Sequence, residues 1–201
     1  KLLEPATMKY QAGQFIQIEV PEFELTDEPV YRAYSMSSDP ACPDEIELEI
    51  RYVPNGICTT YVHQHLNVGD RLTVNGPYGD FHLRDTERDI ICIAGGSGMA
   101  PIKSILHHMV NTNNARRTMY FFGARSARDL FLVDEMKGLE KRLPHFEFIP
   151  ALSDPRPEDR WDGETGLITE VVNRRVGDLS HAEAYLCGSP LMIDACIEVL
   201  R

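Results

Sequence analysis

The pattern of apolar residues changes near the middle of the 201-residue chain, and this change constrains the fold more than any other feature. Up to residue 81, apolar and polar residues alternate in short segments that are separated by glycine and proline turns. Beyond a charged, turn-like link at 85–88, continuous apolar strands alternate with helices. The chain is long enough for two small domains. We therefore expect one domain over residues 1–86 and a second over residues 87–201.

The first half is expected to be a small antiparallel β-barrel. Two segments alternate strictly, at 14–20 and 45–51, and turns follow at 69–70 and 76–79. One helical piece is expected between them, at about 59–66. Short strands with turn signals between them are typical of an antiparallel barrel.

The second half is expected to be a doubly wound parallel sheet. The expected strands are 90–94, 118–122, 145–149 and 184–186, and the expected helices are 100–111, 133–143, 169–175 and 191–200. Continuous apolar strands interleaved with helices predict a parallel sheet that is covered on both faces. Such sheets bind nucleotides beyond the carboxyl ends of their strands.

The composition narrows the class of protein. The formal net charge of −11 disfavours a nucleic-acid partner, because that affinity comes mostly from Lys and Arg on phosphates. Five scattered cysteines show neither a C-x-x-C pair nor the spacing of a plant-type iron–sulfur site, so we expect free thiols in a cytoplasmic protein, with no cluster and no metal site. The apolar runs are too short to cross a bilayer, so no membrane span is expected.

The segment Arg32-Ala33-Tyr34-Ser35 places a cation, an aromatic ring and a hydroxyl within one expected strand. Because alternate side chains of a strand share a face, Arg32 and Tyr34 are expected to project together, with Ser35 on the other side. This set suits a flavin, since a guanidinium pairs with a pyrophosphate and a ring stacks on the isoalloxazine. The alternative is an ordinary strand with a core Tyr and a solvated Arg.

The turn that begins at Gly56 is a second candidate for binding an anion. Gly56, Cys58 and Thr59 lead directly into the expected helix, where backbone N–H groups and Thr hydroxyls could hold a phosphate. Arg51, at the end of the preceding strand, could reach the same anion. The alternative is a plain glycine turn with a Thr N-cap.

A glycine-rich loop follows the first strand of the second half and is expected to hold the phosphates of a nucleotide. Small residues there let the backbone approach a pyrophosphate, and a proline in the first turn of a helix is tolerated. The sequence differs from G-x-G-x-x-G in its last position. The residues concerned are Gly95, Gly96, Ser97, Gly98, Ala100 and Pro101.

Two further turns are expected at the same edge of the sheet. Cys187-Gly188 follows the last strand, so the thiol should face the ligand crevice, although a buried and inert Cys is the alternative. Asp154 lies where adenosine ribose would be expected, and its carboxylate favours NADH over NADPH. Arg125 and Arg128 lie nearby in the sequence and weaken that inference.

Taken in this order, the motifs resemble those of the ferredoxin–NADP reductase superfamily. The family patterns R-x-Y-S, G-P-x-G-x-F and G-G-x-G-x-A-P match residues 32–35, 76–81 and 95–101, and the pyrophosphate and C-G-x-P-x-M turns match 56–59 and 187–192. Ser189 replaces one usual proline. Two branches look most similar, namely the flavin-bearing F subunit of sodium-translocating NADH:quinone reductase and the reductase components of multicomponent oxygenases.

The resemblance implies hydride transfer from NADH to FAD and then delivery of single electrons to an acceptor. Tyr34 would stack on the flavin, Ser35 would hydrogen-bond near its N5 atom, Arg32 would neutralise the pyrophosphate, and Cys187 would help to place the nicotinamide. The protein supplies position while the cofactor supplies the chemistry.

Members of both branches usually carry a [2Fe–2S] domain before the flavin barrel, and most continue to a last strand beyond the closing helix. The chain therefore looks trimmed at both ends, and the acceptor is expected to carry a [2Fe–2S] cluster on a missing domain or a separate protein. Missing segments or partners could also bring the module to the inner face of the membrane. The alternative function is a non-catalytic nucleotide-sensing or scaffold protein with the same fold.

Overall fold

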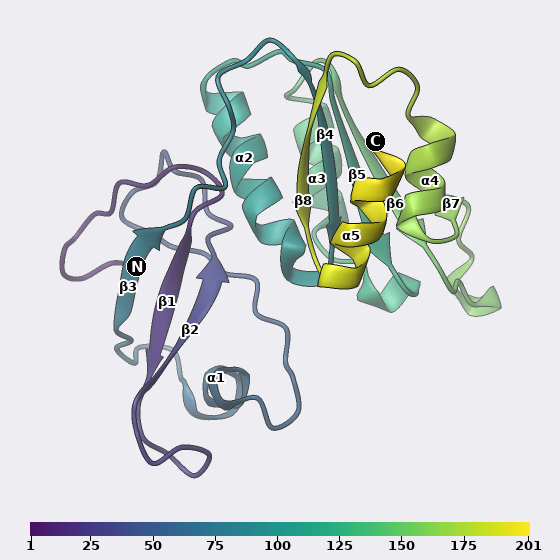
Figure 1. Cartoon of the computed structure of the whole chain (residues 1–201). Coiled ribbons are helices and arrows are strands. Elements are labelled where there is room, and N and C mark those ends of the chain that lie inside the picture. Colours follow the sequence, from purple (N-terminus) through teal and green to yellow (C-terminus); the bar gives the residue numbers. More distant parts are fainter.

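The computed structural model describes all 201 residues, Lys1–Arg201, which form two sheets side by side (Figure 1). The first is a three-stranded sheet in the order β2-β1-β3, and the second is a five-stranded sheet in the order β7-β6-β5-β4-β8. Helix α2 (Met99–Asn111) lies on the side of the second sheet that faces the first domain (Figure 1). The expected fold class, an antiparallel β domain followed by a parallel α/β domain, is confirmed.

The first domain is organised around the strand β1 (Phe15–Val20), in which every second residue is buried. It pairs antiparallel with β2 (Val30–Ser35) on one side and with β3 (Val74–Tyr78) on the other. The inward face of β1 packs on the short helix α1 (Ile57–Thr60), which a π-helical turn, Tyr61–His65, extends. The helical piece expected at 59–66 is therefore confirmed, with its start two residues earlier.

The strand expected at 45–51 is wrong. Only Leu48 pairs with another strand-like residue, through a single antiparallel bridge to Met36. The alternating pattern has another cause, because the carboxylates of Glu47 and Glu49 both lie within 4.0 Å of the ammonium of Lys103 in the second domain. Regular pairing in the first domain is thus limited to three strands.

The second domain follows the expected alternation closely. Its strands are β4 (Asp89–Gly95), β5 (Thr118–Ala124), β6 (Phe146–Leu152), β7 (Glu164–Thr165) and β8 (Ala182–Cys187), all parallel. Its helices, besides α2, are α3 (Val133–Glu140), α4 (Ile168–Arg175) and α5 (Pro190–Val199). The two-residue strand β7 is the one strand of this sheet that the sequence did not predict.

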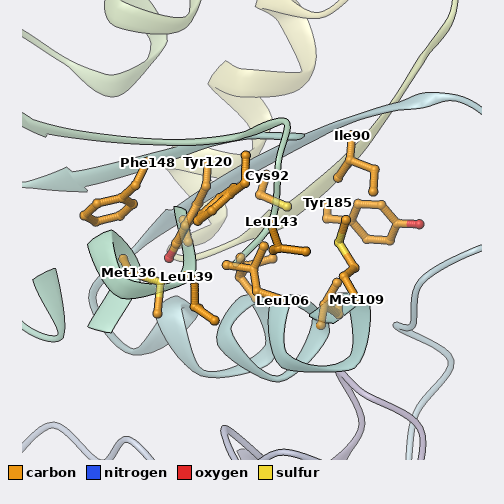
Figure 2. Close-up of a cluster of buried hydrophobic side chains, with 14 of the residues drawn as sticks. Ile90, Cys92, Leu106, Met109, Tyr120, Met136, Leu139, Leu143, Phe148 and Tyr185 are labelled. Carbon is orange, nitrogen blue, oxygen red and sulfur yellow. The ribbon is translucent and has the colours of Figure 1, made fainter. Parts of the chain in front are cut away.

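Helices cover both faces of the parallel sheet, as the sequence predicts. Successive residues of β4 and β5 point to opposite faces, so Cys92 and Tyr120 pack with α2 and α3, whereas Ile93 and Phe121 pack with α4 and α5. Figure 2 shows the first of these clusters, with rings and aliphatic side chains filling the space between strands and helices. This arrangement holds the carboxyl ends of the strands together at one edge.

The two domains are joined by a packed linker between β3 and β4. The rings of Phe81 and Tyr185 meet edge to face with centroids 5.8 Å apart. The Glu183 carboxylate accepts hydrogen bonds from Arg116 at 2.9 Å, Thr86 at 2.8 Å and Tyr185 at 2.8 Å. This network fixes the linker on the parallel sheet. The exact boundary at residue 86 stays a prediction.

Three further findings bear on the kind of protein. No helix has the length and apolarity that crossing a membrane requires. All five cysteines are free thiols. No group of three or more His, Cys, Asp or Glu side chains is arranged to hold a metal ion.

We predict that Glu183→Gln weakens the linker in a pH-dependent way. Burial alone would raise the pKa of Glu183, but hydrogen bonds from Tyr185, Thr86 and Arg116 outweigh it and lower the pKa. A lowered pKa stabilises the fold fully above about 4.3, the unfolded value, and this stabilisation is lost as the pH falls through the folded value. At pH 7 the variant should lose ~1–3 kcal/mol of unfolding free energy.

Urea unfolding between pH 7 and pH 3 measures this difference. The gap between wild type and variant should narrow below pH 5, because protonation then removes the same charge from the wild type. Glu158→Gln, which alters an exposed carboxylate, is the matched control. A gap that is constant over this range would contradict the assignment.

Candidate functional site

The parallel sheet has a topological switch point between β4 and β8. The chain leaves β4, the first strand, for β5 on one side and returns to β8 on the other. The end of β4 lies beside the end of β8, with Ala94 opposite Cys187. Ligands of open α/β sheets bind at such a point, beyond the carboxyl ends of the strands. The loop at 95–101 and the turn at 187–188 therefore meet at the expected binding edge.

The glycines of the 95–101 loop have different physical roles. A Cβ at Gly98 would lie 2.1 Å from the carbonyl oxygen of Cys187, so only glycine lets the two turns meet. Gly96 has a φ of +56° and nothing within 4 Å of its Cβ direction, so its backbone faces open space. Ala100 and Pro101 are buried in the first turn of α2 and support the loop from behind.

Met192 closes the back of this loop. A Cβ at Gly95 would lie 3.1 Å from the Met192 sulfur, and one at Gly188 would lie 2.4 Å from its methyl carbon. Both glycines thus lie against the same flexible side chain, which would have to shift to accept a Cβ at either position. The sequence carried this signal only as part of the C-G-x-P-x-M turn, in which Met192 was not singled out.

A cleft of about 690 Å³ opens between the two domains in front of this loop. Gly96 and Ser97 line it from the second domain, and Glu49 and Arg51 line it from the first. The cleft therefore brings a residue that was expected at the flavin turn, Arg51, to the glycine-rich loop of the nucleotide domain. Its expected action at the Gly56 turn stays a prediction.

Three arginines line the cleft, namely Arg51, Arg125 and Arg128. The one aspartate among the lining residues, Asp129, accepts hydrogen bonds from the backbone N–H and hydroxyl of Ser126 at 3.1 and 2.8 Å. These bonds, with smaller contributions from Arg128 and Arg51, lower the pKa of Asp129. The cleft is therefore suited to an anionic ligand. Arg128 and Glu49 were not among the residues that the sequence assigned to the site.

Asp154 lies just beyond β6 and is paired with Arg125. Its Oδ2 lies 3.2 Å from Arg125 Nε, and its backbone N–H donates to the Arg125 carbonyl at 2.8 Å. Both side chains are exposed. The charge of Arg125 is thus balanced at the position where the sequence places a ribose.

The flavin candidates Arg32 and Tyr34 lie together with Cys58. Burial raises the pKa of Tyr34, and so does an interaction with the Cys58 thiol, while the charge of Arg32 opposes the shift. Burial likewise raises the pKa of Cys58. Arg32 is exposed, with a hydrogen bond to the carbonyl of Tyr31 at 2.8 Å. Strand β2 thus presents a cation and a ring beside Cys58 of α1.

The other residues of this strand lie around that group. Ala33 is exposed and pairs with Gln17, and Ser35 ends the strand half-buried opposite Phe15. No contact in the structure assigns either of them a role.

The turn before α1 is held by its own threonine. The Thr59 hydroxyl lies 3.0 Å from the Val53 carbonyl, 3.2 Å from the Gly56 carbonyl and 3.2 Å from the Val53 N–H. It is therefore engaged in the turn and not directed to a phosphate. The next hydroxyl, Thr60, is buried without any hydrogen-bond partner. A polar ligand at this turn would satisfy it, so these residues fit a flavin dinucleotide.

Cys187 is half-buried behind the glycine-rich loop and does not line the cleft. Burial raises the pKa of its thiol, and no charged group offsets this effect. A protonated thiol is a poor nucleophile. The thiol does not line the cleft, as the sequence had predicted it would, and a role of Cys187 in placing the nicotinamide stays a prediction.

Comparisons with known proteins bear on both domains. Residues 2–83 match the family model of the oxidoreductase FAD-binding domain, and residues 92–198 match that of the oxidoreductase NAD-binding domain. The chain belongs to the ferredoxin reductase family. It is thus an oxidoreductase module with an FAD-binding and an NAD-binding domain.

Several members of the ferredoxin reductase family are similar over nearly the whole chain. The reductase component of propane 2-monooxygenase from Mycolicibacterium goodii is 39% identical over 100% of this chain and 57% of its own length. The F subunit of the Na(+)-translocating NADH-quinone reductase from Neisseria meningitidis is 34% identical over 98% of this chain and 58% of its own. The crystal structure of the Amycolatopsis cytochrome P450 reductase GcoB superposes with a TM-score of 0.86 at 28% identity, covering 96% of this chain and 57% of that one. The chain therefore spans little more than half the length of these relatives.

We predict that Gly98→Ala separates the two turns at the switch point. The added Cβ cannot remain 2.1 Å from the Cys187 oxygen, so the loop must move away from β8. The affinity for NAD⁺ or ADP-ribose should fall at least about tenfold, which is ~1.4 kcal/mol. Isothermal titration measures it. Gly177→Ala, at an exposed glycine with nothing within 4 Å, is the control, and equal losses in both variants would refute the assignment.

We also predict that Arg51→Gln weakens dinucleotide binding without releasing the flavin. Arg51 lines the cleft next to the glycine-rich loop, and loss of a charge-assisted contact to a phosphate costs ~1.5–3 kcal/mol. The dissociation constant for NADH should therefore rise about tenfold or more. Arg71→Gln, at an exposed arginine of the first domain, should leave it unchanged. If the variant loses affinity for FAD and not for NADH, Arg51 acts at the flavin turn, as the sequence predicts.

Proposed function

We propose that this module accepts hydride from NADH on FAD and passes single electrons to a partner that carries a [2Fe–2S] cluster. The observation that carries the proposal is the cleft in which the glycine-rich loop of the NAD-binding domain faces Arg51 of the FAD-binding domain. Bound FAD supplies the chemistry by taking up two electrons as a hydride and releasing them one at a time. Every other contribution is one of binding and position.

The flavin would be held by the first domain. Arg32 presents an exposed guanidinium for the pyrophosphate, and Tyr34, on the same face of β2, presents the ring that would stack on the isoalloxazine. Ser35, at the end of the strand, would donate a hydrogen bond near N5. The Gly56 turn and Thr60 would complete the binding of the dinucleotide.

The NADH would be held by the second domain. The open backbone at Gly96 would bind its phosphates together with Ser97, Arg51 and Arg128 of the cleft. Cys187, packed against Gly98, would limit where the nicotinamide ring can lie. Asp154 would accept hydrogen bonds from the ribose hydroxyls, and its pairing with Arg125 leaves that arginine less available to a 2′-phosphate, which favours NADH over NADPH.

The acceptor is inferred from relatives named as reductase components of monooxygenases and as part of a quinone reductase. Reductases of these kinds pass electrons onward, so we propose an oxygenase-type or quinone-reductase-type chain in the cytoplasm or at the inner face of the membrane. The cluster would reside in another domain of the same protein or in a separate protein.

An anaerobic titration tests the proposed function. The full chain loaded with FAD should be yellow, and its absorbance near 450 nm should be lost on addition of about one equivalent of NADH. NADPH should act far more slowly at the same concentration. A chain that cannot be reconstituted with FAD, or that stays yellow with NADH, would overturn the proposal in favour of a nucleotide sensor.

Ser35→Ala is predicted to slow flavin reduction while FAD stays bound. Hydride transfer needs the reacting atoms at roughly 3–3.5 Å in a set orientation, so loss of a hydrogen bond near N5 should lower the rate by about 10- to 100-fold. Stopped-flow reduction at saturating NADH measures this rate. The matched control is Ser180→Ala, at a serine that hydrogen-bonds only with Asp178. Unchanged single-turnover reduction in Ser35→Ala would remove Ser35 from the mechanism.

A further inference from the structure

A buried lysine lies between the two domains. Lys103, in the second turn of α2, is 2% exposed. Its Nζ lies 2.8 Å from Glu47 Oε2, 3.4 Å from Glu135 Oε2 and 3.9 Å from Glu49 Oε1. Burial alone would lower the pKa of Lys103, but the hydrogen bond to Glu47 and the three carboxylates outweigh it and raise the pKa. The residue is therefore held as an ammonium ion.

The three carboxylates around Lys103 come from both domains. Glu47 and Glu49 belong to the first domain, whereas Glu135 belongs to α3 of the second. Glu135 also interacts with His107 of α2 at 2.9 Å. Without the ammonium, three partly exposed carboxylates of like charge would lie close together across the interface with no cation between them, which is unfavourable. Lys103 is thus the cation that allows this interface to close.

The same face of α2 makes further contacts with the first domain. Ser104 donates a buried hydrogen bond to the Ser38 carbonyl at 2.8 Å, and Asn111 donates to Asp39 at 2.6 Å. Ser38 lies three residues beyond Ser35, the end of β2. Helix α2 is therefore anchored directly to the chain that leaves the flavin strand.

Lys103 is connected to each part of the site. It lies five residues after Gly98, so the helix links it rigidly to the glycine-rich loop. Its closest partner, Glu47, bonds through its backbone to Ser37 and Ser38 at 2.9 and 3.1 Å. Glu49 lines the cleft two residues before Arg51. One side chain is thus coupled to the nucleotide loop, to the flavin strand and to the cleft.

We propose that Lys103 is a positioning residue, whose ammonium sets the separation between the nicotinamide loop and the flavin strand. The inference rests on the proposed hydride transfer, but it names a residue that does not line the cleft. A misplacement of about 1 Å can reduce the rate of such a step about 100-fold. Loss of Lys103 should therefore affect the transfer step more than the affinity for either nucleotide.

Kinetics of the FAD-loaded full chain give the first test. In Lys103→Met, the limiting rate of flavin reduction at saturating NADH should fall about tenfold or more, while the NADH dissociation constant and the FAD content change less than about twofold. Lys103→Arg keeps the charge and should recover most of the rate. Lys137→Met, at an exposed lysine of α3, should behave as wild type. A wild-type limiting rate in Lys103→Met, or a loss in Lys103→Arg as large as in Lys103→Met, would overturn the proposal.

A second test does not depend on flavin chemistry. Melting temperatures of the FAD-free full chain are compared among wild type, Lys103→Met, Glu47→Gln and the double variant. The losses should be strongly non-additive, because both changes break the same contact. Additive losses in melting temperature would refute the inference that Lys103 and Glu47 hold the two domains together through one contact. If Lys103→Met does not fold, Glu47→Gln replaces it in the kinetic test, because this variant leaves two carboxylates beside the lysine. Glu47→Gln should lower the limiting rate of flavin reduction while FAD is retained. An unchanged limiting rate would overturn the proposal.

The two tests distinguish a failure of the proposed function from a failure of the inference about Lys103. Wild-type protein that NADH cannot reduce would refute the proposed function, and the coupling in the FAD-free chain would still report on Lys103. Wild-type protein that is reduced normally, together with additive losses, would refute the role of Lys103 alone.

Discussion

The contact between Gly98 and the carbonyl of Cys187 determines where the nucleotide edge of this molecule lies. It brings the turn after β4 against the turn after β8, at the one point where the chain reverses its direction across the sheet. Met192 of α5 fills the space behind Gly95 and Gly188. The open side of the loop, at Gly96, is the side that faces the first domain across the cleft. The position of the site follows from packing around glycines and does not require a polar cluster.

Helix α2 transmits this position to the first domain. It begins at the glycine-rich loop, buries an apolar side in the core of the parallel sheet, and presents Lys103, Ser104 and Asn111 to the chain beyond β2. A helix is stiff over this length, so the loop at one end and the interdomain contacts along its side keep a constant relation. The linker network around Glu183 holds the domains at the far side of the sheet. Two separated attachments restrict rotation more than either one alone.

The sequence predicted the parts of the fold that depend on local pattern. The strands and helices of the second domain have long runs of one period, and the glycine-rich loop lies between a strand and a helix, where its role is recognisable. The segment at 45–51 was misjudged because alternation shows that one face differs from the other, but not what covers the polar face. Here that cover is Lys103, which is distant in sequence and lies within an apolar helix. The placement of Arg51 in the cleft was missed for the same reason, since only the docking of the domains creates the cleft.

The local distribution of charge explains how an acidic protein of this fold could bind an anionic dinucleotide. The chain carries 31 acidic and 20 basic residues, so its average field repels an anion. Near the cleft, however, each carboxylate has a local partner: Asp129 bonds with Ser126, Asp154 pairs with Arg125, and Glu49 lies beside Lys103. Arg51 and Arg128 have no carboxylate oxygen within 4.0 Å and remain available to phosphates. Since charges are screened over about 8 Å at physiological salt, these two arginines outweigh the distant excess of acid.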